Sequence, residues 1–110
     1  MKGNTIGELE ELVLLTVGSL YEHAYAVAIL EVIKENTNRV LDVTAIHAVL
    51  RRLETKGFVR STMGGATQER GGRRKRFFTL SQAGRQTIEE AMLIRTSLYN
   101  KIPKLTFVSV

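Results

Sequence analysis

The sequence predicts a mainly α-helical fold of the α+β class, with three helices, a two-stranded hairpin and a last helix in that order. Three observations predict it. Apolar residues recur at helical spacing in three early segments. The spacing changes after Gly57 to the alternation typical of strands, and helical spacing returns after Ser81. The 110 residues are enough for one domain with a single modest core.

The first two helices are predicted by apolar stripes that follow the i, i+3, i+4 rhythm. The first is expected over residues 7–20, and Thr5 followed by Glu8 resembles a capping box at its start. The second is expected over residues 25–35, and the polar residues 36–38 end it. Both helices therefore bury one face against a common core.

The third helix is expected to begin after Asp42, a plausible N-cap, and to continue to Lys56. Gly57 can supply the left-handed residue that commonly follows a helix. One face of this helix is apolar, and the opposite face has no purpose in a core. That second face is available for a partner and consists of Thr44, His47, Ala48, Arg51 and Thr55.

The hairpin is predicted from two short runs with strand-like alternation, at residues 58–63 and 75–80. The segment between them contains four glycines and several cations, which indicates a long basic loop. Alternation places Phe78 and Leu80 inward and leaves Phe77 undecided. Since two strands alone are marginal, the hairpin must pack on the helices.

Ser81 can cap a final helix over residues 82–101, which Pro103 ends. This helix carries more apolar surface than one small core can bury, and in a homodimer the simplest cover is the symmetry mate. Candidate interface residues on it are Ile88, Ala91, Met92, Arg95, Leu98 and Tyr99. The chain is therefore divided into a 1–81 domain and an 82–110 dimerisation helix with an apolar tail, whose last residues, 105–110, remain unplaced.

The net charge of +5 is distributed unevenly. Residues 1–42 contain three basic and seven acidic side chains, whereas residues 51–76 contain nine basic and two acidic ones. Such a concentration creates a positive field suited to phosphate, on nucleic acid or on an anionic membrane. A merely solvated basic face is the alternative interpretation.

Three helices followed by a hairpin with a glycine-rich basic tip is the order of a winged helix-turn-helix. In that fold the helix before the hairpin lies in the major groove, and the hairpin, or wing, contacts the backbone or the minor groove. This order makes double-stranded DNA the expected partner. The candidate DNA-binding residues are Tyr25, Thr44, His47, Arg51, Arg70, Arg73, Arg74 and Lys75.

Individual roles on that surface differ. Thr44 and His47, near a helix start, can donate to phosphates or reach base edges. Arg51, one turn further on, can contact a guanine with two hydrogen bonds. Tyr25 can offer its hydroxyl to a phosphate or simply pack. Phosphate contact is favoured over base reading for each of these residues.

Other classes of protein have little support. The chain has no cysteine and only two histidines, a poor metal set, so no metal, cofactor or catalytic residue is expected and the protein is not predicted to be an enzyme. The sequence shows no secretory leader and no apolar run long enough to cross a bilayer, which favours a cytoplasmic protein without a membrane partner. A winged helix that binds an acidic protein partner remains the alternative to a DNA-binding one.

Four segments resemble the PadR-like transcriptional regulators. They are GELEELVLL at 7–15, AYAVAI at 24–29, VLRRLETKGFV at 49–59 and ERGGRRKRFFTLSQAGR at 69–85, within residues 6–90. Two positions depart from the family pattern. His47 stands where the family usually has Tyr, and Ala26 stands where it usually has Gly.

The resemblance implies a dimeric repressor of the short subfamily with a single C-terminal helix. It implies dimerisation through that helix with help from the first helix, which adds Leu9, Leu12 and Val13 to the candidate interface. A two-fold dimer would bind a palindromic operator. The resemblance further implies release from DNA by a small aromatic ligand, although the chain has no Trp on which such a ligand could stack.

Overall fold

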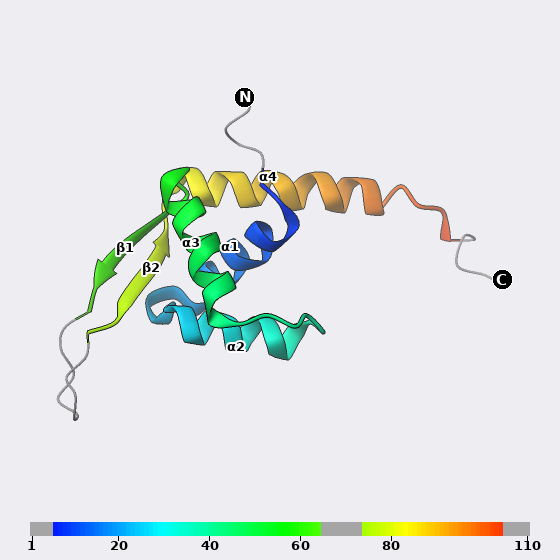
Figure 1. Cartoon of the computed structure of the whole chain (residues 1–110). Helices are drawn as coiled ribbons and strands as arrows, with labels where there is room; N and C mark the ends of the chain where they lie inside the picture. The colour runs from blue at the N-terminus through cyan, green and yellow to red at the C-terminus, as the bar shows by residue number, and fades with distance from the viewer. Residues whose placement is uncertain (1–5, 65–73, 105–110) are drawn as a thin grey trace.

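The computed structural model describes residues 6–64 and 74–104, and it has the mainly helical α+β architecture that the sequence predicts. Figure 1 shows α1, α2 and α3 gathered into one body, with the hairpin at one end and α4 along one side. The elements, in chain order, are α1 (Glu8–Leu20), the short 3-10 helix η2 (Tyr21–His23), α2 (Ala26–Asn36), α3 (Val43–Thr55), β1 (Val59–Met63), β2 (Arg76–Leu80) and α4 (Gln82–Tyr99).

A single hydrophobic core contains residues from all four α-helices and from the hairpin. Its largest fully buried side chains come from α1, α2 and α3, and Phe58, Val59 and Phe78 extend it under the hairpin. Ile88, from the first half of α4, belongs to the same cluster. One core therefore spans both the 1–81 segment and the beginning of the 82–110 segment.

The caps predicted for the last two α-helices are confirmed. Asp42 accepts a hydrogen bond from the Ala45 N–H at 3.0 Å, and Gly57 after α3 has φ of +82°. Ser81 accepts from the Gly84 N–H at 3.0 Å and donates its hydroxyl proton to the Gly57 carbonyl at 2.6 Å. Local side-chain chemistry thus sets both helix starts.

The first helix begins at Glu8, one residue later than predicted, and Thr5 of the predicted capping box lies outside the described residues. Gly7 is the N-cap of α1, and its N–H donates to Glu10 Oε1 at 2.8 Å. Glu10 therefore makes one of the two hydrogen bonds of a capping box, the one from the N-cap backbone N–H to the N3 side chain. Glu8 instead lies in the first turn, where its charge suits the positive end of the helix dipole.

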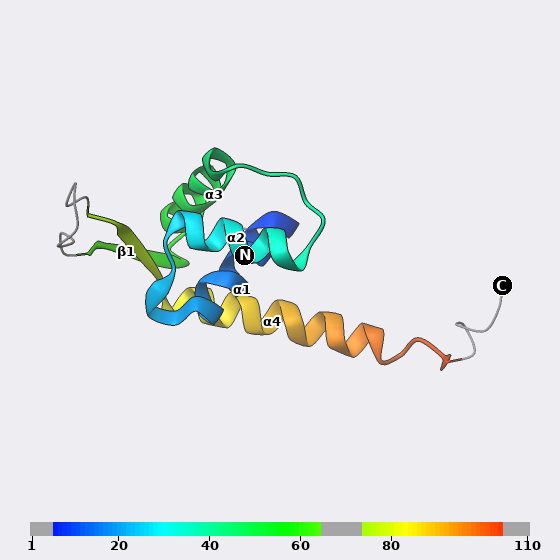
Figure 2. The ribbon, with the colours of Figure 1, turned by 90° about the horizontal axis from the view of Figure 1, so that it is seen from below.

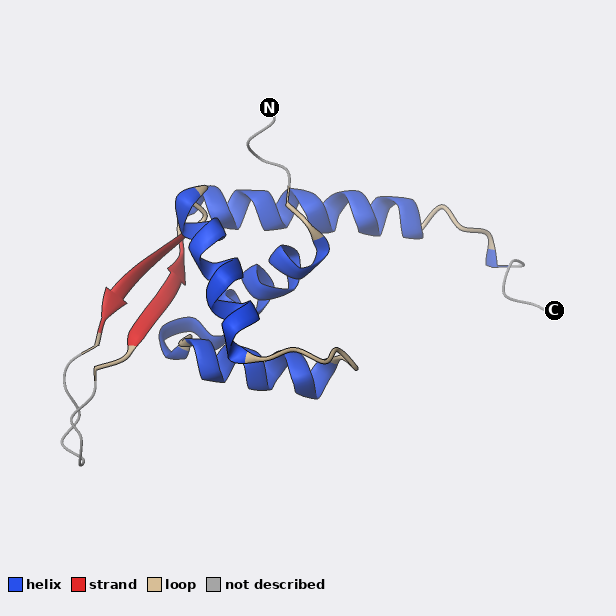
Figure 3. Cartoon of the chain, viewed as in Figure 1, coloured by secondary structure: helices blue, strands red, loops and turns tan. Residues whose placement is uncertain are grey.

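The hairpin is a two-stranded antiparallel sheet in which Val59 pairs with Leu80 and Met63 with Arg76 (Figure 3). Phe78 is buried, as its alternation predicts. The Phe78 N–H donates to the Ala24 carbonyl at 2.8 Å, which ties β2 to the segment between η2 and α2. The wing base is therefore attached to the helical body through backbone as well as side chains.

Helix α4 has two dissimilar halves. Its first turn lies against the body, where a Cβ added at Gly84 would collide with the Phe58 carbonyl. The end of its second half projects beyond α1, α2 and α3, as two perpendicular views show (Figures 1 and 2). The second half of α4 and the turn that follows it expose a series of large apolar side chains, namely Leu93, Ile94, Leu98, Tyr99 and Ile102.

Candidate nucleic-acid interface

The outward face of α3 carries the side chains that the sequence predicts to be available to a binding partner. Ile46, Val49, Leu50 and Leu53 point into the core. The other side leaves four side chains exposed and Ala48 half-buried; the exposed ones are Thr44, His47, Arg51 and Thr55. The predicted division of α3 into a core face and a free face is confirmed.

The two neighbouring arginines of α3 differ in their surroundings. Arg52 Nε lies 3.5 Å from Glu10 Oε2, so this side chain turns toward α1. Arg51 is exposed, and among the described residues no hydrogen bond or ion pair holds its guanidinium. Arg51 is thus free to meet a ligand with all of its N–H donors.

The N-terminus of α3 is partly occupied by its own cap. Asp42 already accepts the Ala45 N–H, and its carboxylate places a negative charge beside the first turn. A phosphate at this helix end would therefore lose one backbone donor and meet a like charge. Side-chain donors, such as the exposed Thr44 hydroxyl, remain available there.

A hollow of about 360 Å³ lies where the start of α2, the middle of α3 and residues 74–78 of the wing meet. It brings four of the predicted DNA-binding residues together from three separate elements. Among the described residues that line it, none is Asp or Glu. The lining residues are Tyr25, Ala26, Val27, His47, Arg74, Lys75, Arg76 and Phe78.

Hydrogen bonds fix two of the wing cations near the loop end of the two strands. Arg74 Nε donates to the Gly64 carbonyl at 3.0 Å, across the two strands. Arg76 Nη1 donates to Ser61 Oγ at 3.0 Å, and Ser61 donates in turn to Glu54 Oε2 at 2.8 Å. This Glu54–Ser61–Arg76 chain connects α3 to both strands, and nothing in the local sequence pattern indicated it.

Phe77, which alternation left undecided, packs against Tyr25. The two ring centroids are 5.6 Å apart with the planes at 71°, an edge-to-face contact. The ammonium of Lys75 lies 4.2 Å from the centroid of the same Tyr25 ring. Tyr25 is the N-cap of α2, so the wing touches the helix-turn-helix at this residue.

Two predicted DNA contacts, Arg70 and Arg73, lie outside the described residues.

Within residues 6–64 and 74–104, no three His, Asp or Glu side chains gather in a way that could hold a metal ion. None of the helices in that part of the chain is long and apolar enough to cross a membrane.

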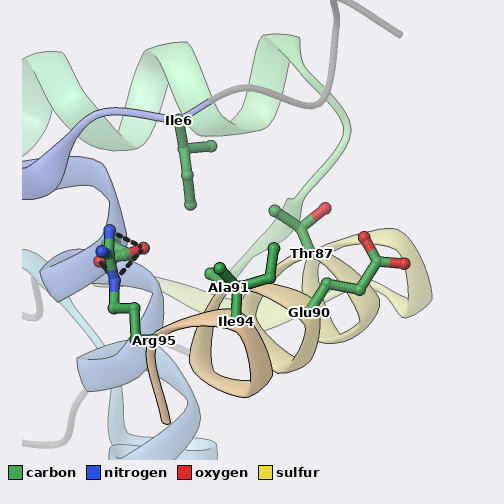
Figure 4. A pocket seen from close by; sticks show the side chains of 7 residues that line it. Ile6, Thr87, Glu90, Ala91, Ile94 and Arg95 are labelled. Atoms are coloured by element: carbon green, nitrogen blue, oxygen red, sulfur yellow. Dashed lines mark hydrogen bonds and ion pairs between the residues drawn. The ribbon is translucent and has the colours of Figure 1, made fainter. Parts of the chain in front are cut away.

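A second surface lies between α1 and α4. Arg95 Nη2 donates to Glu11 Oε2 at 2.9 Å, and Arg95 Nε donates to both carboxylate oxygens. These hydrogen bonds, with the attraction of the Glu11 charge, raise the pKa of Arg95. Arg95 lies beside a hollow of about 250 Å³, which is lined by Ile6, Glu11, Thr87, Glu90, Ala91, Ile94 and Arg95. Figure 4 shows six of these side chains, from the segment before α1 and from α4.

The candidate dimer residues separate into three groups by burial. Leu98, Tyr99 and Arg95 are exposed on the projecting half of α4. Leu9, Leu12, Ala91 and Met92 are half-buried at the edge of the core. Val13 has no exposed surface and Ile88 has 7%, because both pack inside a single chain. Val13 is therefore corrected from an interface residue to a core residue.

The fold and this arrangement define a winged helix-turn-helix with one appended C-terminal helix. Among solved structures, a PadR-family transcription regulator from Clostridium difficile has 17% identity, a TM-score of 0.72, and coverage of 86% of this chain and 93% of that one. A PadR-like transcription factor from Bacteroides fragilis has 20% identity, a TM-score of 0.70 and 84% coverage of both chains. The chain thus has the fold of PadR-family regulators.

A third solved structure contains nucleic acid. It is Bacillus subtilis PadR in complex with operator DNA, with 18% identity and a TM-score of 0.64. The match covers 81% of this chain and 49% of that chain. No protein-family model matches the sequence, and no curated protein does.

Proposed function

We propose that this chain is a PadR-like, DNA-binding transcription regulator, not an enzyme, and that it represses transcription as a homodimer. The observation that carries the proposal is the hollow at the junction of α2, α3 and the wing, whose described lining has several cations and no carboxylate. The cations of such a surface attract and neutralise DNA phosphates, and the counterions bound to those phosphates are released. The operator complex of a protein with the same fold adds support.

Within this proposal Thr44, His47, Arg74 and Lys75 contact phosphates, as do Arg70 and Arg73 of the wing loop, and Tyr25 lines the same hollow. Arg51 has a different role, because its free guanidinium sits on the outward face of α3. A guanidinium presented by a recognition helix can bind guanine O6 and N7 together. The sequence alone favours phosphate contact for Arg51 as well. Its guanidinium on the outward face of α3, unpaired among the described residues, is the reason to propose base reading there.

Fluorescence anisotropy with duplex DNA from upstream of the protein's own gene, against a scrambled duplex, tests the proposal. A local repressor binds the upstream duplex at least about a thousandfold more tightly than the scrambled one. Reporter expression from that promoter then falls when the protein is supplied. Equal, weak binding to both duplexes would contradict a sequence-specific regulator and favour a winged helix with an acidic protein partner.

The homodimer is proposed to form through the projecting half of α4 and the exposed edge of α1. A two-fold dimer presents two copies of α3, so its operator has two half-sites separated by about one helical turn, roughly 10 base pairs. Footprinting is expected to reveal two symmetric protected segments. Protection of one asymmetric half-site would contradict the dimer.

A small aromatic effector is proposed to bind the hollow between α1 and α4, because apolar lining and a charged pair meet there. An Ala91→Phe variant fills this hollow, and Ser97→Phe, on a residue that does not line it, is the matched control. A panel of flat aromatic dyes should bind the Ser97→Phe protein and lose affinity for the Ala91→Phe protein, with both still dimeric. Equal dye binding by the two variants would exclude this hollow.

A further inference from the structure

The ring of Tyr25 contacts two side chains of the wing. Phe77 meets it edge to face at 5.6 Å, and the Lys75 ammonium lies over its face at 4.2 Å. Phe77 lies in β2, and Lys75 directly precedes that strand. The same strand is tied by its backbone to Ala24, the residue directly before Tyr25.

Phe77 needs this contact for a simple reason of strand geometry. Successive side chains of a strand point to opposite faces, so Phe77 faces away from the core that buries Phe78. Tyr25 supplies the apolar surface that keeps Phe77 half-buried. Without that ring, Phe77 would be exposed to water on one side of the wing, and β2 would lose its side-chain attachment to α2.

Lys75 gains a fixed position from the same ring. A lysine side chain is flexible, and an ammonium over an aromatic face is held there by the quadrupole of the ring. The position lies at the rim of the hollow that also contains His47 and Arg74. The ring therefore holds Lys75 beside the α3 side chain His47 before any DNA arrives.

We propose that Tyr25 is a positioning residue for the wing, and that its ring, not its hydroxyl, is what DNA binding requires. The inference rests on the proposed function and specifies how one site of it is assembled. The Tyr25 hydroxyl makes no hydrogen bond with the described residues, so its removal leaves the clamp of Phe77 and Lys75 intact.

Two substitutions of Tyr25 separate ring from hydroxyl. Tyr25→Phe keeps both ring contacts, and its operator affinity should stay within about twofold of wild type. Tyr25→Leu removes them, and its affinity should fall at least about fivefold, with a salt slope lower by about one. An equal loss in Tyr25→Phe and Tyr25→Leu would overturn the proposal, because the hydroxyl would then be the group that binds phosphate.

Combination with Lys75→Ala shows whether the ring acts through the wing. Lys75→Ala and Tyr25→Leu remove the two sides of one contact. The loss of binding free energy in the double variant should therefore be smaller than the sum of the losses in the two single variants. Additive losses would contradict a positioning role. A general loss of fold stability, followed by thermal unfolding, would lower affinity without producing this coupling to Lys75.

A measurement without DNA keeps this inference distinct from the proposed function. The methylene protons of Lys75 beside a ring face should have upfield-shifted NMR signals in the wild type and in Tyr25→Phe, and ordinary shifts in Tyr25→Leu. Ordinary Lys75 shifts in the wild type would overturn the positioning role even if operator binding is intact. Shifted signals in a protein that binds no duplex would instead count against the proposed function alone.

Discussion

Glu10 accepts hydrogen bonds from Lys56 Nζ at 3.1 Å through both of its carboxylate oxygens. The pair joins the first turn of α1 to the residue that follows α3, and Arg52 approaches the same carboxylate. Glu10 is almost completely buried, so these cations meet an acceptor with little competing water. The end of the proposed recognition helix is thus fixed to the body, while Arg51 remains free.

The Glu10 carboxylate makes stability depend on pH. Burial alone would raise its pKa, but hydrogen bonds from Gly7 N–H, Lys56 and Arg52 together outweigh burial and hold the pKa below the ordinary value of 4.5. A group with a lowered pKa in the folded state contributes stability above its unfolded pKa and loses it as pH falls through the folded value. Folding should therefore weaken below about pH 4.5.

A Glu10→Gln variant tests this dependence. Its free energy of unfolding should be lower at pH 7 by about 1 to 3 kcal/mol, and this deficit should shrink as the pH falls toward 3. Urea unfolding at several pH values measures both. Glu89→Gln, on an exposed carboxylate of α4, is the control and should follow the wild type. A constant deficit at every pH would contradict the assignment.

Gly84 permits the close approach of α4 to the body. A Cβ there would collide with the Phe58 backbone, so Gly84→Ala must displace α4 and should destabilise the fold by about 1 to 3 kcal/mol. Gly18→Ala is the matched control, because its Cβ would meet only the Leu80 side chain at 3.1 Å. Thermal unfolding of both variants measures the difference. Equal stability of the two would refute the close approach.

The Glu54–Ser61–Arg76 chain should set the angle between wing and α3. Ser61→Ala removes the shared hydroxyl, and we expect a loss of about 1 kcal/mol of stability and of roughly twofold or more in operator affinity. Ser61→Thr retains a hydroxyl and should recover most of both. If Ser61→Thr binds DNA as poorly as Ser61→Ala, the hydroxyl is not what matters at this position.

The exposed half of α4 should hold two chains together. Leu98→Glu places a charge within the proposed interface and is expected to convert a dimer into monomers in sedimentation experiments, with helical circular dichroism preserved. Ser97→Glu adds the same charge outside the apolar lining and should leave the dimer intact. A Leu98→Glu protein that remains dimeric would place the interface elsewhere.

Local chemistry explains why much of the fold could be predicted from sequence. Asp42, Gly57 and Ser81 each act on backbone groups within a few residues, or at a turn, so their roles are visible in the sequence. The core face of α3 and the inward position of Phe78 follow from periodicity alone. The same reasoning placed the N-cap of α1 at Thr5 and not at Gly7. Glu8 follows Thr5 by three residues and Glu10 follows Gly7 by three residues, so both pairs have the spacing of a capping box.

Contacts between distant residues could not be predicted in this way. Glu10 and Lys56 are 46 positions apart, and Glu11 and Arg95 are 84 apart. Periodicity also could not show whether Val13 is a core residue or a dimer-interface residue. An apolar stripe that faces the core has the same spacing as one that faces a partner. Only the packed helices reveal that Val13 is covered within its own chain.

Operator binding by variants of two neighbouring arginines, measured across a salt series, tests whether the outward face of α3 reads DNA. In Arg51→Ala the affinity for the upstream duplex should fall about tenfold, and base substitutions at one guanine should no longer matter. Arg52→Ala, whose side chain turns toward Glu10, should bind nearly as the wild type does, with the same steep salt slope. If Arg52→Ala loses more affinity than Arg51→Ala, or if neither changes it, the outward face of α3 is not the surface that reads DNA.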